Sequence, residues 1–237
     1  MKTLSITLTV IISLAVSACS FNLGVKGNGK VITQERNVSE KFTEIRGSAG
    51  LDIYLIQGNE YKIEVEADEN LQQFIETDIT NGKLHITTSE NIGWSKAKKI
   101  YVTFIEVNTI EASSGADVVG KSMIKSETLS LKSSSGADLE IEVFSKDISA
   151  QTSSGAEIKV AGKASSLVAK ASSGSELDAK DLMVVSCTAE ASSGAEIKLN
   201  VKDFLDANAS SGADIQYVGN PTSVNANKSS SGSVKKL

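Results

Sequence analysis

Residue types that build common catalytic and metal sites are scarce in this 237-residue chain. It has one histidine, His85, and two cysteines, Cys19 and Cys187. A single histidine excludes multi-histidine metal sites, and two cysteines exclude cysteine-rich ones. The Gly-x-Ser-x-Gly, Walker and His-Glu-x-x-His motifs are also missing. We therefore expect no cofactor, no resident metal and no catalytic residue.

Positive charge and aromatic rings are limited as well. The chain has 24 Lys and Arg against 29 Asp and Glu, and aromatic residues make up 5% of it. Without residues 1–18, which contain Lys2 and no acid, 23 basic and 29 acidic residues remain, a formal charge of −6. An acidic chain is a poor partner for phosphate backbones, so we expect no binding to nucleic acid.

The first residues have the order of a bacterial lipoprotein signal. Lys2 is followed by an apolar run, residues 4–16, and then by Ser17-Ala18-Cys19. The run is too short to span a bilayer, so we predict that residues 1–18 are a cleaved signal peptide. Lipidation of Cys19 would anchor the mature protein, and Ser20 favours the outer membrane, with its face undecided. The alternative is an ordinary secretory signal with a coincidental cysteine.

Two N-terminal segments precede the most regular part of the sequence. Residues 19–30 are polar and glycine-rich without periodicity, which predicts a lipidated tether. In residues 31–108 apolar and polar residues alternate, which predicts half-buried strands and hairpins. Asn81-Gly82 predicts a tight hairpin turn, and a short helical turn fits only residues 69–75.

Residues 109–237 form a repeat array. Seven copies of Ser-Ser-Gly, six of them followed by a small residue and an acid, recur every 18–21 residues. This spacing predicts an all-β fold, a single-stranded β-helix whose rungs of about twenty residues stack ~4.8 Å apart, with right-handed winding as the default. We expect the chain to turn a corner at each glycine, where a Cβ would obstruct either the backbone conformation or a close approach. These glycines are Gly115, Gly136, Gly155, Gly174, Gly194, Gly212 and Gly232.

Alignment of the copies on glycine places similar residues in columns. The position after the acid is aliphatic, and a second aliphatic column six residues before the second serine contains Cys187. We therefore predict that Cys187 is an inert buried thiol. Small residues near the corner predict a narrow edge of the cross-section. In the alternating pattern of a strand, the second serine should point inward, so we expect a ladder of buried hydroxyl groups.

The acids of the motif should fall on one outer edge of the stack. Like charges at rung spacing repel or recruit a cation, so this edge is a candidate binding or cation site. The alternative is a solvated edge that discourages aggregation, eased by Lys159 and Lys198. The acids are Asp117, Asp138, Glu157, Glu176, Glu196 and Asp214.

Two single residues outside the array have chemical potential. His85 lies in an alternating strand, and its parity predicts a solvated side chain. Trp94 follows Asn91-Ile92-Gly93 in a loop. It either anchors that loop by packing onto the fold or offers an exposed ring for stacking on a sugar.

From about residue 31 to the C terminus, the sequence resembles the Bacteroidetes envelope family called putative auto-transporter adhesin, head GIN domain. The resemblance is carried by residues 46–55 (RGSAGLDIYL), 63–71 (IEVEADENL) and 81–86 (NGKLHI), and by the Ser-Ser-Gly-Ala-Asp repeats. It implies a β-helical fold and a periplasmic or surface lipoprotein. It supplies no catalytic motif.

Together these features predict a noncatalytic lipoprotein of the cell envelope that binds a glycan or another surface component. The first alternative is a carbohydrate-active, pectinase-like β-helix enzyme. Such lyases use a calcium cluster with a basic residue, usually arginine, whereas Arg36 and Arg46 both precede the array. The second alternative is a purely structural envelope protein, and the oligomeric state stays open.

We predict that Cys19→Ala moves the protein from the membrane fraction to the soluble fraction and leaves the fold intact, because the acyl chains supply the membrane affinity. Cell fractionation and circular dichroism of the purified variant measure the two effects. Unchanged partition into the membrane fraction would contradict lipid anchoring at this cysteine.

Overall fold

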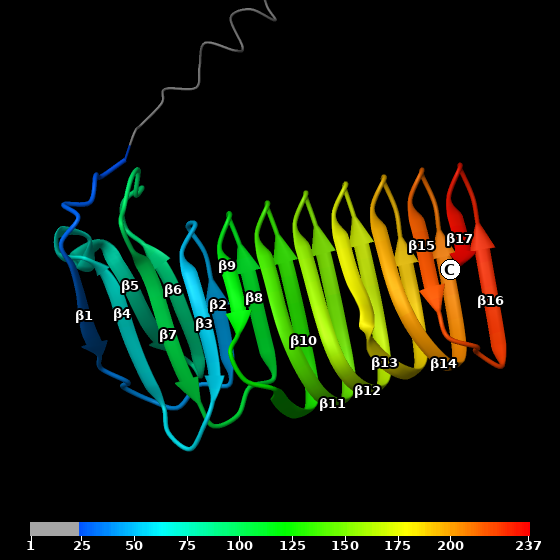
Figure 1. Cartoon of the computed structure of the whole chain (residues 1–237), viewed down its shortest axis with the longest axis horizontal. Coiled ribbons are helices and arrows are strands. Elements are labelled where there is room, and N and C mark those ends of the chain that lie inside the picture. Colours follow the sequence, from blue (N-terminus) through cyan, green and yellow to red (C-terminus); the bar gives the residue numbers. More distant parts are fainter. Residues whose placement is uncertain (1–23) are drawn as a thin grey trace, which may run out of the picture.

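The computed structural model describes residues 24–237; the predicted signal peptide and Cys19 lie outside this part. The described chain forms a 17-stranded sheet arrangement with one short helix, η1 (Glu69–Phe74), where a helical turn was predicted. Figure 1 shows the strands stacked side by side from the blue N-terminal end to the red C-terminal end. The fold is an all-β solenoid of about seven turns with rungs about 19 residues apart, which confirms the prediction of a β-helix.

Long parallel strands build the regular part of the solenoid. They are β10 (Ile124–Ser134), β11 (Asp138–Ser153), β12 (Glu157–Ser172), β13 (Glu176–Ala191) and β14 (Glu196–Ala209), and each pairs with the next. The first residues of β11 pair with β9 (Asp117–Gly120) and the remainder with β10. The strands β11 to β14 therefore each cross both walls of the solenoid. The stack ends with β15 (Asp214–Val218), β16 (Ser223–Lys228) and β17 (Ser233–Lys236).

The two walls are distinguished by the serine-glycine corners. We call the outward face of the strands that lead into the corners the entry wall, and the outward face of those that leave them the exit wall. The entry wall includes β10, the C-terminal halves of β11 to β14, and β16. The exit wall includes β9, the N-terminal halves of the same strands, β15 and β17.

The core between the walls consists of stacked columns, as predicted. In the column after the acid, Leu139, Ile158 and Leu177 stack in register and are at most 1% exposed. Full burial of each such side chain contributes about 1.5–3 kcal/mol, which an isolated rung could not obtain. In the second column Cys187 stacks between Leu167 and Leu205. Burial raises the pKa of its thiol to about 12, so Cys187 is the inert core residue that the pattern predicts.

Each corner is a tight turn with two consecutive residues at positive φ. At the third copy, φ is 57° for Ser154 and 69° for Gly155, and the Ala156 amide donates to the Ser153 carbonyl at 3.3 Å. This geometry resembles the type I′ turn, whose twist matches that of the flanking strands. A Cβ at Gly155 would meet no atom within 4 Å. The glycine is therefore needed for its conformation and not for lack of space.

The second serine of the motif does not form the predicted ladder of buried hydroxyl groups. Ser154 takes the first positive-φ position, its side chain is exposed, and its carbonyl accepts the Gly136 amide at 3.1 Å. The prediction is wrong because two left-handed residues interrupt the two-residue period of a strand. The inward position belongs instead to the small residue after the glycine, such as the buried Ala156.

The last corner turns one residue earlier than the alignment on glycine predicts. Ser230 and Ser231 have φ values of 48° and 64°, and the Gly232 amide donates to the Ser229 carbonyl at 2.9 Å. Gly232 lies at the inward position, where a Cβ would overlap the carbonyl of Ala209. Its assignment as a turn glycine is therefore wrong, since close backbone approach and not positive φ requires it.

The stack extends into the N-terminal region in an order that differs from the sequence. β2 (Glu44–Gly47) and β3 (Asp52–Gln57) flank a corner at Ala49-Gly50, whose φ values of 61° and 67° match the array. On one side of this rung, β2 pairs with β6 (Lys83–Thr88) and β3 with β7 (Lys98–Phe104). On the other side, β2 pairs with β8 (Thr109–Ser113) and β3 with β9. One continuous core therefore joins the N-terminal region to the repeats.

Antiparallel strands cover the N-terminal end of the stack. β4 (Lys62–Asp68) pairs with β7, and β1 (Val31–Arg36) pairs with β4. β5 (Ile75–Thr80) pairs with β6 through the Asn81-Gly82 turn, which confirms the predicted hairpin. Such a cap shields the backbone groups of the first parallel rung, which would otherwise be an open edge.

We predict that Gly155→Val lowers the free energy of unfolding by about 2 kcal/mol, because a β-branched residue disfavours positive φ. Gly155→Asn should cost less than about 1 kcal/mol, since asparagine tolerates the left-handed region. Urea denaturation of both variants makes the comparison. Equal losses would show that the backbone conformation is not what selects glycine.

Candidate functional site

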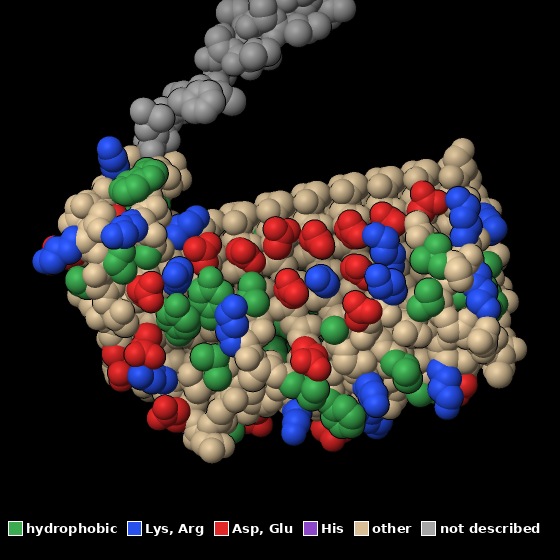
Figure 2. Space-filling view, in the orientation of Figure 1, with side chains coloured by type: hydrophobic (Ala, Val, Ile, Leu, Met, Phe, Trp, Pro, Cys, Tyr) green, Lys and Arg blue, Asp and Glu red, His purple; other side chains and the backbone are tan. Residues whose placement is uncertain are grey.

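The acids of the motif form one row along the exit wall. Register places Asp138 beside Asp117 and Glu157, and the row continues through the remaining motif acids. Figure 2 shows it as a line of red side chains that follows the stack beneath the corners. Asp52 of β3 pairs with Asp117 and extends the row by one rung. We call this row the acid ladder: Asp52, Asp117, Asp138, Glu157, Glu176, Glu196 and Asp214.

Burial, and after it repulsion within the acid ladder, raises the pKa of two of the ladder carboxyls. The pKa of Asp117 is raised by burial and then by the charges of Asp52 and Asp138. The pKa of Glu157 is raised by burial and then by Glu176 and Asp138. Ionisation of these two groups therefore opposes folding, as expected where like charges stack at rung spacing.

A lysine relieves the repulsion farther along the ladder. Lys198 lies 2.6 Å from Glu176 and 3.5 Å from Glu196, and its hydrogen bond to Glu176 raises its pKa. Lys159, also expected to ease the edge, forms its ion pair with Glu140 at 3.6 Å. The ladder is thus neutralised in part around Glu176 and remains repulsive around Glu157.

The acid ladder does not gather its carboxylates into a coordination site. In residues 24–237, no group of three or more His, Cys, Asp and Glu side chains is close enough to hold a metal ion. One acid per rung in a straight row cannot surround a cation, which prefers six to eight oxygen ligands when it is calcium. The row acts as a negatively charged border beside the corners.

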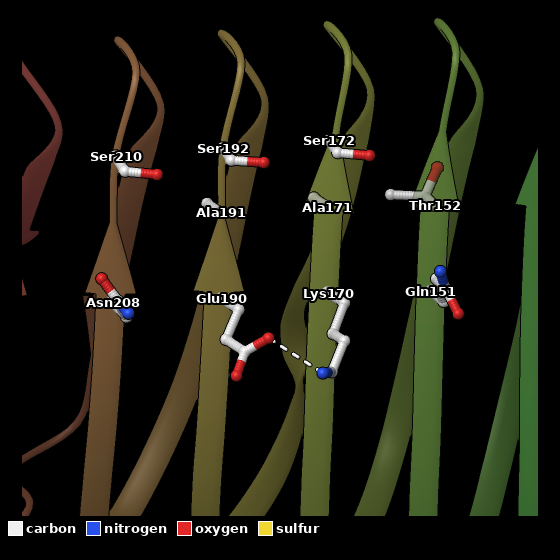
Figure 3. A pocket seen from close by; sticks show the side chains of 10 residues that line it. All are labelled: Gln151, Thr152, Lys170, Ala171, Ser172, Glu190, Ala191, Ser192, Asn208 and Ser210. Carbon is white, nitrogen blue, oxygen red and sulfur yellow. Dashed lines mark ion pairs between the residues drawn. The ribbon is translucent and has the colours of Figure 1, made fainter. Parts of the chain in front are cut away.

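A shallow polar groove crosses four rungs of the entry wall. Gln151, Lys170, Glu190 and Asn208 occupy one register column, and the first serines of the adjoining corners form a parallel row, Ser172, Ser192 and Ser210. Figure 3 shows both rows side by side, with the Lys170–Glu190 ion pair, 2.9 Å long, between two rungs. The groove has a volume of about 310 Å³.

A second hollow on the same wall extends this polar surface toward the opposite corner. It has a volume of about 420 Å³ and is lined by hydroxyl groups from several rungs, including Ser130 and Ser149, which pair in register. The Ser166 hydroxyl donates to the Asp147 carboxylate at 2.6 Å. The entry wall therefore offers amides, hydroxyls and paired charges at a period of ~4.8 Å.

His85 and Trp94 lie away from both hollows. His85 is exposed on β6, as predicted, and pairs in register with Arg46. Trp94 is 53% exposed on the loop between β6 and β7. The expectation that it packs onto the fold as a loop anchor is therefore wrong, and the ring faces solvent.

The described part of the predicted tether, residues 24–30, is fastened to that loop. The Val25 amide donates to the Asn91 carbonyl and the Gly27 amide to the Trp94 carbonyl, both at 2.7 Å. The prediction of a free tether to residue 30 is wrong because composition alone does not reveal backbone partners that lie far away in the sequence.

The family model described as putative auto-transporter adhesin, head GIN domain matches residues 41–221. The chain belongs to this family. The matched region spans the solenoid from the segment before β2 to the segment after β15. None of the curated proteins matches the chain.

Solved structures of Bacteroides and Parabacteroides proteins have the same fold as this head GIN domain protein. A putative adhesin from Bacteroides fragilis has a TM-score of 0.83 at 19% identity and covers 90% of this chain and 100% of its own. A putative lipid binding protein from Parabacteroides distasonis has a TM-score of 0.74 at 20% identity, covering 90% and 99%. A putative adhesin from Parabacteroides merdae scores 0.73 at 19% identity, covering 90% and 98%.

Sequence reasoning missed Asp52 and the polar columns of the entry wall. The segment Ser48-Ala49-Gly50-Leu51-Asp52 has the corner signature with two substitutions, so a search that tolerated replacement of the second serine and of the small residue would have found it. The entry-wall columns vary from rung to rung, as in Gln151, Lys170 and Glu190. Such columns give no repeated residue to recognise.

We predict that Glu157→Gln raises the free energy of unfolding by up to about 0.5 kcal/mol at pH 7, because it removes a repelled charge. A raised pKa means that the parent carboxyl is favourable when protonated and that this contribution is lost as pH rises through the raised pKa. The gain should vanish below about pH 4.

Glu176→Gln is the matched control, because Glu176 has Lys198 as a partner and should give no gain. Urea denaturation of both variants at pH 7 and below about pH 4 measures the effect. A Glu157→Gln protein less stable than the parent at neutral pH would contradict repulsion within the ladder.

Proposed function

We propose that this protein is a noncatalytic adhesin-type module of the cell envelope, anchored at the outer membrane by lipid on Cys19, and that it binds a linear glycan along its entry wall. Membership in the head GIN domain family supports a role in adhesion. Among residues 24–237, no helix combines the length and apolar composition needed to cross a membrane.

The observation that carries the proposal is the groove on the entry wall. Gln151 and Asn208 supply amide groups at its two ends, and Ser172 and Ser192 supply hydroxyls beside them. These groups both donate and accept hydrogen bonds, which suits the hydroxyl groups of a sugar. A chain polymer that lies along the solenoid axis would meet a polar group on every rung, so many weak contacts would add up.

The charge beside the groove selects among glycans. The acid ladder lies just across the corners from the serine row, because each ladder acid follows its corner serines by a few residues, as Glu157 follows Ser153. An acidic polysaccharide would be repelled over a Debye length of about 8 Å. We therefore expect a neutral polymer to bind better than a uronic-acid polymer.

Neither alternative function gains an observation of comparable weight. A pectinase-like enzyme would need a basic residue at a reaction centre, and the only basic residue in the first groove, Lys170, is ion-paired with Glu190. A purely structural protein would not need polar hollows that span several rungs.

We predict that the Gln151→Ala/Asn208→Ala variant binds neutral polysaccharide about tenfold more weakly than the parent, because two hydrogen bonds are worth about 1–3 kcal/mol. Affinity electrophoresis of the Cys19→Ala protein against neutral and acidic polysaccharides measures the effect.

The matched control, Gln34→Ala/Asn200→Ala, removes two amides that lie on the cap and the exit wall and should bind as the parent does. Equal weakening in both variants, or binding of acidic polymers only, would contradict the assignment of the entry wall.

A further inference from the structure

An apolar and basic surface lies at the N-terminal end of the solenoid. Trp94 is 53% exposed, Ile92 is half-buried beside it in the loop, and the Lys26 ammonium lies 5.9 Å from the centre of the Trp94 ring. Lys96, two residues after the tryptophan, is exposed as well. We call these four residues the Trp94 patch. Figure 2 shows green and blue side chains side by side where the described chain begins.

The Trp94 patch is held in place by backbone hydrogen bonds and by one buried carboxylate. Asp68, at the end of β4, is fully buried and accepts the amides of Gly29, Lys96 and Ala97 at 2.7, 3.0 and 3.1 Å. One side chain therefore fastens the first described segment to the loop that carries Trp94. A buried carboxylate with three donors is well satisfied, so the exposed ring is displayed from a fixed base.

The position of this surface relative to Cys19 suggests its partner. Only five peptide steps separate Cys19 from Gly24, and an extended chain of that length spans at most about 18 Å. Gly24 precedes Val25 and Lys26 directly, so the Trp94 patch cannot lie far from the acyl chains once Cys19 is lipidated.

We propose that the Trp94 patch seats on the lipid surface and fixes the solenoid end-on to the membrane. This inference rests on the proposed lipid anchor at Cys19. Tryptophan favours the headgroup region, where its ring is buried and its N–H remains hydrated, and each lysine near an anionic surface contributes attraction. The anchor raises the effective concentration of the lipid surface, so a weak contact of one ring and two lysines is sufficient.

The charge of the rest of the molecule supports the end-on orientation. The acid ladder runs along the stack away from the cap, and anionic headgroups would repel it if the solenoid lay on its corner edge. The same orientation leaves the entry wall free along its length. A hollow beside Trp94 is lined by Lys26, Asn28 and two glycines. It offers a sugar fewer polar partners than the entry wall does.

The test uses Trp94 as its own probe, because it is the only tryptophan in the chain. The acylated protein is reconstituted into vesicles of phosphatidylethanolamine and phosphatidylglycerol, with or without brominated acyl chains, after mass spectrometry has established the lipid on Cys19. We expect the Trp94 emission to shift to the blue and to lose most of its intensity with brominated lipid. The Cys19→Ala protein without vesicles gives the solvent-exposed reference.

A matched control moves the probe to another exposed site. In a Trp94→Phe/Phe144→Trp protein the tryptophan replaces Phe144, which is 57% exposed on β11, three strand positions from β7 in the stack. Its emission should stay unquenched in the same vesicles. Quenching of both proteins to the same extent would overturn end-on seating in favour of a molecule lying flat.

Failure of the anchor and failure of the seating give different results. Absence of acyl chains from Cys19 would overturn the lipid anchor and the seating that rests on it. An acylated protein whose Trp94 emission equals that of the soluble reference would overturn the seating alone. A blue shift of the Trp94 emission with a neutral polysaccharide, but not with vesicles, would overturn the membrane seating. It would identify the Trp94 patch as a sugar-stacking site.

Discussion

In-register stacking of backbones at ~4.8 Å is the interaction on which the rest of this structure depends. It forces each rung to repeat the side-chain directions of the rung before it, so inward residues form columns such as Leu139, Ile158 and Leu177. The same rule governs the outside, where it places carboxylates such as Glu157 beside their like neighbours although they repel. The acid ladder is therefore tolerated by the fold, and burial of the apolar columns outweighs its cost.

A stack of this kind has two ends, and the protein treats them differently. The N-terminal end is closed by antiparallel β1 and β4 and by the β5–β6 hairpin, and Asp68 fastens the first described residues across this cap. The rung formed by β2 and β3 precedes β6 and β7 in the sequence but lies between them and the first rung of the array, β8 and β9. The cap thus holds residues 25–29 against the solenoid.

Features repeated on every rung could be predicted from the sequence, and features made by single long-range contacts could not. Repetition identified the glycine corners, the aliphatic columns and the place of Cys187 in the core. The alternating pattern wrongly predicted that the second serine points inward, because positive φ interrupts the strand period there. The alignment on glycine wrongly placed Gly232 within the turn, whereas it lies at the inward position that follows the turn. Asp68 gave no signal, because its donors are 28 to 39 residues away along the chain.

The uneven regularity of the surfaces supports the proposal that the entry wall binds the ligand. The corners and the acid ladder are nearly identical on each rung, as a solution to turning and stacking requires, whereas the outward column from Gln151 to Asn208 changes at every rung. Stacking alone does not explain that variation, because any polar residue would satisfy an outward position. The variable column lines a hollow, whereas the acid ladder does not, which is why we propose the entry wall as the binding surface. A membrane contact at the capped end would keep that wall accessible, with the acid ladder holding the solenoid clear of anionic lipid.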